Sequence, residues 1–324
     1  MIGDPVSQSP EDLLKPRALR SGGTIGIVAP ASPPDDSQVR RGVQWWEDHG
    51  YRVKLGRHVF RRDYYLAGPA EARAEDLMAM FGDPEVDAIQ VTQGGYGSAQ
   101  LIPFIDFSLI AANPKIFVGM SDITSLQVAM LRKTGLVTFY GPGAVRLGMG
   151  ATEQTQARLL KVLKSDALGE LPQDPAFPYV RILGAGRATA ALVGGDLYEL
   201  RGSLGTDWAT ETKNQLLFFE DEGNPPWQVD GMLDQLKQAG RLAVAGIAIG
   251  ELANCDWTEE KRKWAATKTL EQVLDYYLAD LGIPVVYGLP IGHGQHNLTI
   301  PLGVAATLDA EARTLAFEET ALAT

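Results

Sequence analysis

The chain has few residues of the types on which several protein classes depend. It holds one cysteine, Cys255, and four histidines among 324 residues. A single thiol cannot form an internal disulfide, so nothing in the sequence points to an oxidising compartment. Cys255 is predicted to be a small, buried apolar side chain. The sequence has no Cys/His ligand pattern, H-E-x-x-H motif or P-loop, so we predict neither a metal nor a cofactor.

Long apolar runs and an excess of positive charge are also absent. No segment reaches transmembrane length, and residues 1–20 contain acidic residues but no apolar run of the kind found in secretory signals. The formal net charge is -11, and an acidic surface repels nucleic-acid phosphate and anionic lipid. The sequence therefore predicts a cytoplasmic protein that binds neither nucleic acid nor membrane.

The residues that are present suit a folded protein of two domains. Hydrophobic residues make up 45% and charged residues 21%, as in ordinary globular proteins, and the length exceeds an average single core. Strand and helix patterns alternate in the first half, which predicts an α/β fold with a mostly parallel sheet and helices on both faces. The strands are expected at 23–30, 51–55, 86–92 and 115–119, and the helices at 37–50, 70–81, 98–105 and 122–133.

The second half has a denser pattern of strands. A polar helix at 152–164 is followed by a proline-rich stretch that we interpret as a linker. Strands are then expected at 188–193, 216–220, 244–252, 285–288, 304–308 and 314–317, with helices at 226–239 and 258–281. We therefore predict an N-terminal extension (1–20), an α/β domain (21–165), a linker (166–185) and a smaller β-rich domain (186–324).

Ser121 is the candidate nucleophile. It follows the apolar strand 115–119 and stands directly before a helix. A strand–turn–helix arrangement exposes a serine hydroxyl on a sharp turn and aims free helix N–H groups at the group it attacks. The full G-x-S-x-G pattern is absent, because Ile123 occupies the position of the second glycine. A helix N-cap would also explain a serine at this position.

Histidine is scarce enough for each one to be weighed. His49 ends a predicted helix, where an imidazolium is stabilised by the helix dipole, and His58 lies in a basic segment expected to be exposed. His293 has a glycine on each side and follows a strand, and such loops let substrate approach a side chain closely. His293 is therefore the candidate general base, with His296 as its competitor.

Two further segments follow predicted strands. The Gly94-Gly95-Tyr96-Gly97 loop lacks the full G-x-G-x-x-G spacing of a dinucleotide site, but it could cradle a phosphate or donate an N–H to an oxyanion. Glu220 is the first carboxylate of an acidic turn at the end of an apolar strand. A carboxylate in that position can orient a histidine, although acidic turns commonly face solvent.

Taken together, several short motifs resemble those of one peptidase family. They occur in order at 23–34, 94–97, 119–124, 194–197, 219–221, 292–293 and 302–303. This ordered set resembles the LD-carboxypeptidase family of serine peptidases, which includes muramoyltetrapeptide carboxypeptidases and microcin C immunity proteins. The resemblance implies an N-terminal α/β domain similar to class I glutamine amidotransferases, a smaller C-terminal β-rich domain, and an active site between them. It also implies a homodimer.

The same resemblance implies roles for individual residues. The catalytic triad is expected to consist of Ser121, His293 and Glu220. Backbone N–H groups of Gly95 and Asp122 are expected to bind the oxyanion. The substrate is expected to contact Gly94, Tyr96 and Trp227, although Trp227 could equally pack in a dimer interface.

The chain departs from the family pattern at three positions that bear on substrate. Arginines common in the family are replaced by Gln93, Gln228 and Gly231, and arginine is the side chain best suited to bind a carboxylate through two hydrogen bonds. The leading hypothesis is a serine carboxypeptidase that releases a terminal D-amino acid from a peptidoglycan-derived tetrapeptide. Hydrolysis of peptidyl- or aminoacyl-nucleotide amides is the alternative, and a non-catalytic ligand-binding protein is the third hypothesis.

Overall fold

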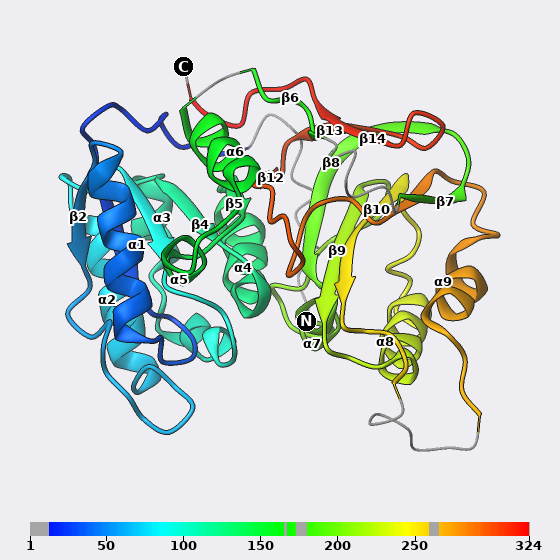
Figure 1. Cartoon of the computed structure of the whole chain (residues 1–324), viewed down its shortest axis with the longest axis horizontal. Helices are drawn as coiled ribbons and strands as arrows, with labels where there is room; N and C mark the ends of the chain where they lie inside the picture. The colour runs from blue at the N-terminus through cyan, green and yellow to red at the C-terminus, as the bar shows by residue number, and fades with distance from the viewer. Residues whose placement is uncertain (1–12, 165–166, 173–179, 259–265, 324) are drawn as a thin grey trace.

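The computed structural model describes residues 13–164, 167–172, 180–258 and 266–323. These residues form two sheets, each with its own helices, that lie side by side in Figure 1. Pro175 and Pro178, on which the linker prediction partly rests, lie outside the described residues. Within the described ranges, no helix is both long enough and apolar enough to span a bilayer.

The first sheet has the strand order β12-β5-β4-β3-β1-β2. The four strands predicted for this half run parallel, as does β5, which was not predicted, while β12 comes from the far end of the chain and pairs antiparallel with β5. The strands are β1 (Thr24–Val28), β2 (Arg52–Leu55), β3 (Ala88–Val91), β4 (Ile116–Gly119), β5 (Thr138–Tyr140) and β12 (Ile300–Leu302).

Helices lie along this sheet in the order expected from the sequence. The segment predicted as a helix at 98–105 is a 3-10 helix that contains Pro103, which cannot donate a helical hydrogen bond. The elements are α1 (Asp36–Asp48), α2 (Ala70–Gly82), η2 (Ser98–Phe104), α3 (Phe107–Ala112), η3 (Ser121–Ile123), α4 (Thr124–Thr134), α5 (Ala144–Gly148) and α6 (Glu153–Lys164).

The second sheet has the strand order β6-β14-β13-β8-β9-β10-β11-β7. Four central strands run parallel: β8 (Arg187–Asp196), β9 (Leu216–Glu222), β10 (Gly246–Ala253) and β11 (Val285–Tyr287). The outer strands pair antiparallel and are β6 (Gly169–Glu170), β7 (Arg181–Gly184), β13 (Ala305–Asp309) and β14 (Thr314–Phe317). The helices of this half are α7 (Leu197–Gly202), α8 (Pro226–Gln238) and α9 (Leu270–Leu278).

Two predictions for this half need correction. The strands β6 and β7 fall inside 166–185, so the described part of that stretch forms sheet edges rather than a free linker. Hydrogen bonds to neighbouring strands satisfy their backbone N–H and C=O groups. A segment of two to four residues is too short to show a strand pattern in the sequence. The helix α9 is also shorter than the predicted 258–281, of which 259–265 lie outside the described residues. The exact limits of the two domains stay a prediction.

A continuous hydrophobic core joins the two sheets. Tyr140 on β5 and Phe218 on β9 are fully buried, and their rings meet edge to face with centroids 5.2 Å apart. The same cluster includes Ile300 of β12 and Val286 of β11. Fully burying side chains of this size contributes about 1.5–3 kcal/mol each. The shared core therefore holds the two sheets against each other and sets how their edges meet.

Candidate active site

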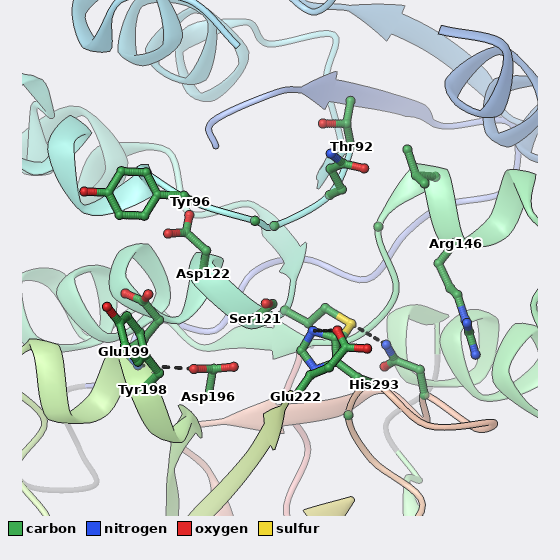
Figure 2. Close-up of a pocket in the computed structure, with 18 of the residues that line it drawn as sticks. Thr92, Tyr96, Ser121, Asp122, Arg146, Asp196, Tyr198, Glu199, Glu222 and His293 are labelled. Carbon is green, nitrogen blue, oxygen red and sulfur yellow. Dashed lines mark hydrogen bonds and ion pairs between the residues drawn. The ribbon is translucent and has the colours of Figure 1, made fainter. Parts of the chain in front are cut away.

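A cavity of about 630 Å³ lies where the carboxyl ends of strands from both sheets meet. Parallel strands bring their following loops to one edge, and α/β proteins bind ligands there. The first sheet contributes the loop after β3 and Ser121 after β4. The second contributes Asp196 from β8, Glu222 from β9 and His293 from the loop after β11 (Figure 2). Both halves of the chain therefore line the cavity.

Ser121 has a strained backbone at the turn between β4 and α4. Its φ is 63°, in the left-handed region that non-glycine residues rarely adopt, at a cost of about 1–3 kcal/mol. Its N–H donates to the Tyr140 hydroxyl at 2.9 Å. An N-cap residue instead has extended backbone, and the Ser121 side chain caps neither η3 nor α4. The helix-cap interpretation of Ser121 is therefore wrong.

The Gly94–Gly97 loop packs against the Ser121 turn. The Asp122 carboxylate accepts the Gly97 N–H at 2.8 Å and the Ser98 N–H at 2.9 Å. A Cβ atom at Gly94 would lie 2.9 Å from the Ser121 Cβ, so only glycine permits this approach. The backbone N–H groups of Gly95 and Asp122 donate to no described residue. Their expected role as oxyanion donors stays a prediction.

His293 contacts Glu220 through two atoms. The His293 Nδ1 lies 2.8 Å from Glu220 Oε2, and the His293 backbone N–H donates to the same oxygen at 3.2 Å. Glu220 is fully buried. A Cβ atom at Gly292 would lie 2.4 Å from that oxygen, which explains the glycine before His293. The carboxylate therefore orients the imidazole and leaves Nε2 toward the cavity.

The other three histidines lie elsewhere. The His49 Nδ1 is 2.7 Å from a carbonyl of its own helix, α1, as expected for a helix end. His58 pairs with a carboxylate of α2 and is partly buried rather than exposed. His296 is buried, with Nδ1 3.0 Å from Thr152 Oγ1. Of the four, only His293 lines the cavity.

The acidic turn sends its carboxylates to opposite sides of β9, as strand alternation requires. Glu220 and Glu222 face His293, with the Glu222 carboxylate 3.6 Å from Nε2. Asp221 instead accepts a hydrogen bond from the Asn224 amide at 2.7 Å and contacts Cys255. Cys255 is buried, as predicted.

Tyr140 is a site residue that the sequence did not indicate. Its hydroxyl donates to Glu220 Oε1 at 2.5 Å and accepts the Ser121 N–H. Burial, with Glu220 and Asp196 nearby, raises the pKa of Tyr140 well above its usual range, so the hydroxyl keeps its proton. The available signal was a tyrosine ending a buried strand just before Gly141-Pro142-Gly143.

Ser121 and His293 line the same cavity but form no hydrogen bond with each other. The Ser121 hydroxyl makes no hydrogen bond to any described residue, and His293 Nε2 faces Glu222. Burial alone would lower the pKa of His293, but Glu220, Glu222 and Asp196 outweigh burial and raise it to about 9. A missing hydrogen bond between Ser121 and His293 is compatible with catalysis, because catalytic hydrogen bonds often form only when substrate binds.

Further carboxylates make this cavity acidic. Burial, together with Glu220 and Asp221, raises the pKa of Asp196 well above its usual range. Burial and nearby Asp122 raise the pKa of Glu199 to about 7, although its hydrogen bond from Ser125 opposes this. Single ligand atoms of Asp196, Glu220 and His293 lie within 4.8 Å of one another. Both Glu220 oxygens accept hydrogen bonds, Oε1 from the Tyr140 hydroxyl and Oε2 from His293.

Comparison with known proteins identifies the family. Residues 25–141 match the family model described as the LD-carboxypeptidase N-terminal domain, and residues 189–308 match that of the C-terminal domain. The chain belongs to the LD-carboxypeptidase family. It is accordingly a serine hydrolase of the LD-carboxypeptidase type.

Individual relatives of this LD-carboxypeptidase cover nearly its whole length. The protein named "Probable murein peptide carboxypeptidase" of Bacillus subtilis (strain 168) is 38% identical, over 94% of each chain. The murein tetrapeptide carboxypeptidase of Pseudomonas aeruginosa is 33% identical, over 89% of this chain and 93% of its own. A solved structure of the microcin C7 self-immunity protein MccF, in complex with aspartyl sulfamoyl adenosine, has a TM-score of 0.85 and 28% identity. That alignment covers 96% of this chain and 100% of MccF.

Of the residues expected to bind substrate in this LD-carboxypeptidase, some line the cavity and others do not. Gly94, Gln93 and Tyr96 line the cavity, with the Tyr96 ring against Tyr65. The positions 227, 228 and 231 lie on α8 and do not line it. A substrate role for Trp227 stays a prediction.

Proposed function

We propose that this enzyme cuts an L,D amide bond and releases a terminal D-amino acid from a peptidoglycan-derived tetrapeptide. The observation that carries the proposal is one continuous set of contacts around the cavity. The Ser121 backbone N–H donates a hydrogen bond to the Tyr140 hydroxyl, and that hydroxyl donates to Glu220. The Glu220 carboxylate in turn forms a hydrogen bond with His293 Nδ1. The names of the murein carboxypeptidase relatives support this substrate class.

In the proposed first step, Ser121 Oγ attacks the amide carbonyl carbon while His293 Nε2 takes the hydroxyl proton. Glu220, held at Nδ1, keeps the imidazole in the useful tautomer and stabilises the imidazolium. Backbone N–H groups of Gly95 and Asp122 bind the developing oxyanion. Removing one such donor typically costs about 10²–10³ in rate.

In the proposed second step, the tetrahedral intermediate collapses and the C–N bond breaks. His293 gives its proton to the leaving amine, and the acyl group stays on Ser121 as an ester. Water then attacks this ester with His293 as general base, and the Ser121 hydroxyl is restored. No group outside the chain and water is required.

The test is release of D-alanine from a tetrapeptide whose last bond is L-lysyl- or diaminopimelyl-D-alanine. We expect turnover by the wild type and a loss of about 10⁶ in kcat in Ser121→Ala. Ser108→Ala is the matched control: Ser108 is exposed, so this variant should retain full activity. If Ser121→Ala still releases D-alanine, Ser121 is not the nucleophile.

A second candidate is hydrolysis of aminoacyl-nucleotide amides. It is favoured by the fold shared with MccF, whose structure holds aspartyl sulfamoyl adenosine. Cleavage of that compound without cleavage of the tetrapeptide would select this function. If neither amide is hydrolysed and Ser121 is not labelled by a serine-reactive phosphonate, the enzyme proposal fails.

We also propose the larger organisation that the family resemblance implies. The α/β part at 21–165 would resemble class I glutamine amidotransferases and carry the nucleophile, and the part at 186–324 would carry acid and base. The two sheets and the two separate family matches support this division. Light scattering during size-exclusion chromatography tests the proposed homodimer, which should elute at twice the 35.0 kDa chain mass.

A further inference from the structure

Arg146 is the only arginine or lysine among the described residues that line the active-site cavity. It stands on α5, and its Nη2 donates to the carbonyls of Gly294 at 2.8 Å and Gln295 at 3.0 Å. Those carbonyls directly follow His293 in the chain, so Arg146 lies on the His293 side of the cavity. No carboxylate within the described ranges forms an ion pair with it, and no other hydrogen bond of its guanidinium is found there. Glu251 lies nearby, and Arg146 partly offsets the burial that raises the pKa of Glu251 to about 7.

Four carboxylate side chains in the lining of the cavity repel anions. Asp122, Asp196, Glu199 and Glu222 all line it, and Figure 2 shows Asp196 and Glu199 on the opposite side of Ser121 from Arg146. Apart from His293 and the backbone N–H groups beside Ser121, Arg146 is therefore the place in the described lining where a negatively charged group of a bound substrate is favoured. An arginine fork can hold a carboxylate through two parallel charge-assisted hydrogen bonds.

The chemistry of the leaving group points to the same place. His293 must pass its proton to the amide nitrogen as the C–N bond breaks, so the departing residue lies beside His293. In a C-terminal residue, the carboxylate carbon is only two bonds from that nitrogen. The carboxylate therefore lies close to the loop after His293, whose carbonyls Arg146 holds.

We propose that Arg146 binds the C-terminal carboxylate of the departing residue and thereby restricts the enzyme to the last amide bond of a peptide. This inference rests on the proposed function and adds a specificity-determining residue to it. A longer peptide, cut at an internal bond, would place a neutral amide beside Arg146 instead of a carboxylate. Such a substrate would lose both charge-assisted hydrogen bonds and leave the guanidinium without an anionic partner.

The test compares two tetrapeptides that differ only at the end, one with a free D-alanine carboxylate and one with a D-alanine carboxamide. We expect the wild type to prefer the carboxylate by about 10- to 100-fold in kcat/KM, the usual range for charged hydrogen bonds. In Arg146→Met the ratio should fall to near one, and Arg146→Lys should lie between. Arg41, which holds the Gly148 carbonyl outside the cavity, gives a matched control in Arg41→Met with an unchanged ratio.

The ratio separates recognition from loop positioning. If Arg146 only positions the loop beside His293, Arg146→Met will slow both peptides equally and the wild-type preference will survive, which overturns the inference. Wild-type hydrolysis of both peptides at equal rates also overturns it and leaves the proposed function intact.

Calorimetry on the Ser121→Ala background repeats the comparison without turnover. In Ser121→Ala, the carboxylate peptide should bind more tightly than the carboxamide peptide. When Arg146→Met is added, the two peptides should bind equally well. Equal binding with Arg146 present counts against the inference. If the wild type neither hydrolyses nor binds either peptide, the proposed function fails and this inference fails with it.

Discussion

At the scale of single residues, Tyr140 connects the two halves of the site. Its one hydroxyl satisfies both the strained Ser121 N–H and the buried Glu220 Oε1. Glu220 is fully buried, so water cannot easily replace the Tyr140 hydroxyl as its partner. The hydroxyl therefore contributes to stability and to the geometry of the reacting groups at once.

Tyr140→Phe should reduce both stability and activity. A buried partner left unsatisfied costs about 1–3 kcal/mol, and the same loss in the transition state corresponds to about 5- to 150-fold in kcat. Urea unfolding and steady-state kinetics measure the two effects. Tyr51→Phe is the matched control, because the buried Tyr51 hydroxyl has no hydrogen-bond partner among the described residues and its removal should be nearly neutral.

Glu222 sets how readily His293 can act as a base. Its carboxylate lies 3.6 Å from Nε2 and stabilises the imidazolium, contributing to the raised His293 pKa of about 9. A base must be unprotonated, so kcat/KM should rise with pH through this pKa and fall below it. The Glu222 side chain is 48% exposed, so solvent screens the pair.

Glu222→Gln should move the acid limb of the kcat/KM profile to lower pH. A screened pair contributes about 0.2–1 kcal/mol, so activity at pH 7 should rise about 1.4- to 5-fold relative to the plateau. Glu47→Gln, which changes the net charge equally on the exposed face of α1, should leave the profile unchanged. A profile that Glu222→Gln does not move would mean that Glu222 does not influence the titrating base.

At the scale of elements, the loop after β11 depends on a close approach to β9. Gly292 has a φ of +117°, and any Cβ there would lie 2.4 Å from the Glu220 carboxylate oxygen. The loop can therefore place the His293 Nδ1 on Glu220 only if residue 292 has no side chain. Sequence shows the glycine, but only the packing shows what it avoids.

Gly292→Ala should lower kcat/KM at least tenfold, because Glu220 must shift away from His293. Gly282→Ala is the control, since Gly282 also has a positive φ of +69° but nothing lies within 4 Å of an added Cβ. Both variants should lose about 1–2 kcal/mol of stability from backbone strain, measured by urea unfolding. Equal activity in the two variants would refute the clash with Glu220.

At the scale of the whole molecule, the two sheets share one core. Phe218 from β9 packs against Tyr140 from β5, and β12 returns from the second half to extend the first sheet. The halves should therefore unfold together, although the family matches are two separate regions.

Phe218→Ala should destabilise the whole chain by about 3–5 kcal/mol. Circular dichroism and residual activity, followed in urea, should give one coincident transition in the wild type and one shifted transition in the variant. Phe104→Ala is the control, because Phe104 is 46% exposed and its loss should have little effect. Two separate transitions would show that the halves fold independently.

The sequence by itself determined the alternation of strands and helices in the first half, and the glycine and serine turns at strand ends. Both depend on local periodicity and on residues near one another in the chain. It also indicated Ser121, Glu220 and His293 as candidates, because each follows an apolar strand. Edge strands of two to four residues, such as β6, β7 and β12, carried too little pattern to be predicted.

The tertiary structure decided what depends on contacts between distant residues. Tyr140 and Glu220 are 80 residues apart, and Glu220 and His293 are 73 apart. Strand order and a shared core bring them together, and no local pattern encodes either. For the same reason, only the structure placed Arg146 on the cavity and turned Asp221 away from it. The candidate residues were readable in the chain, and their arrangement around one cavity came from the packing of two sheets.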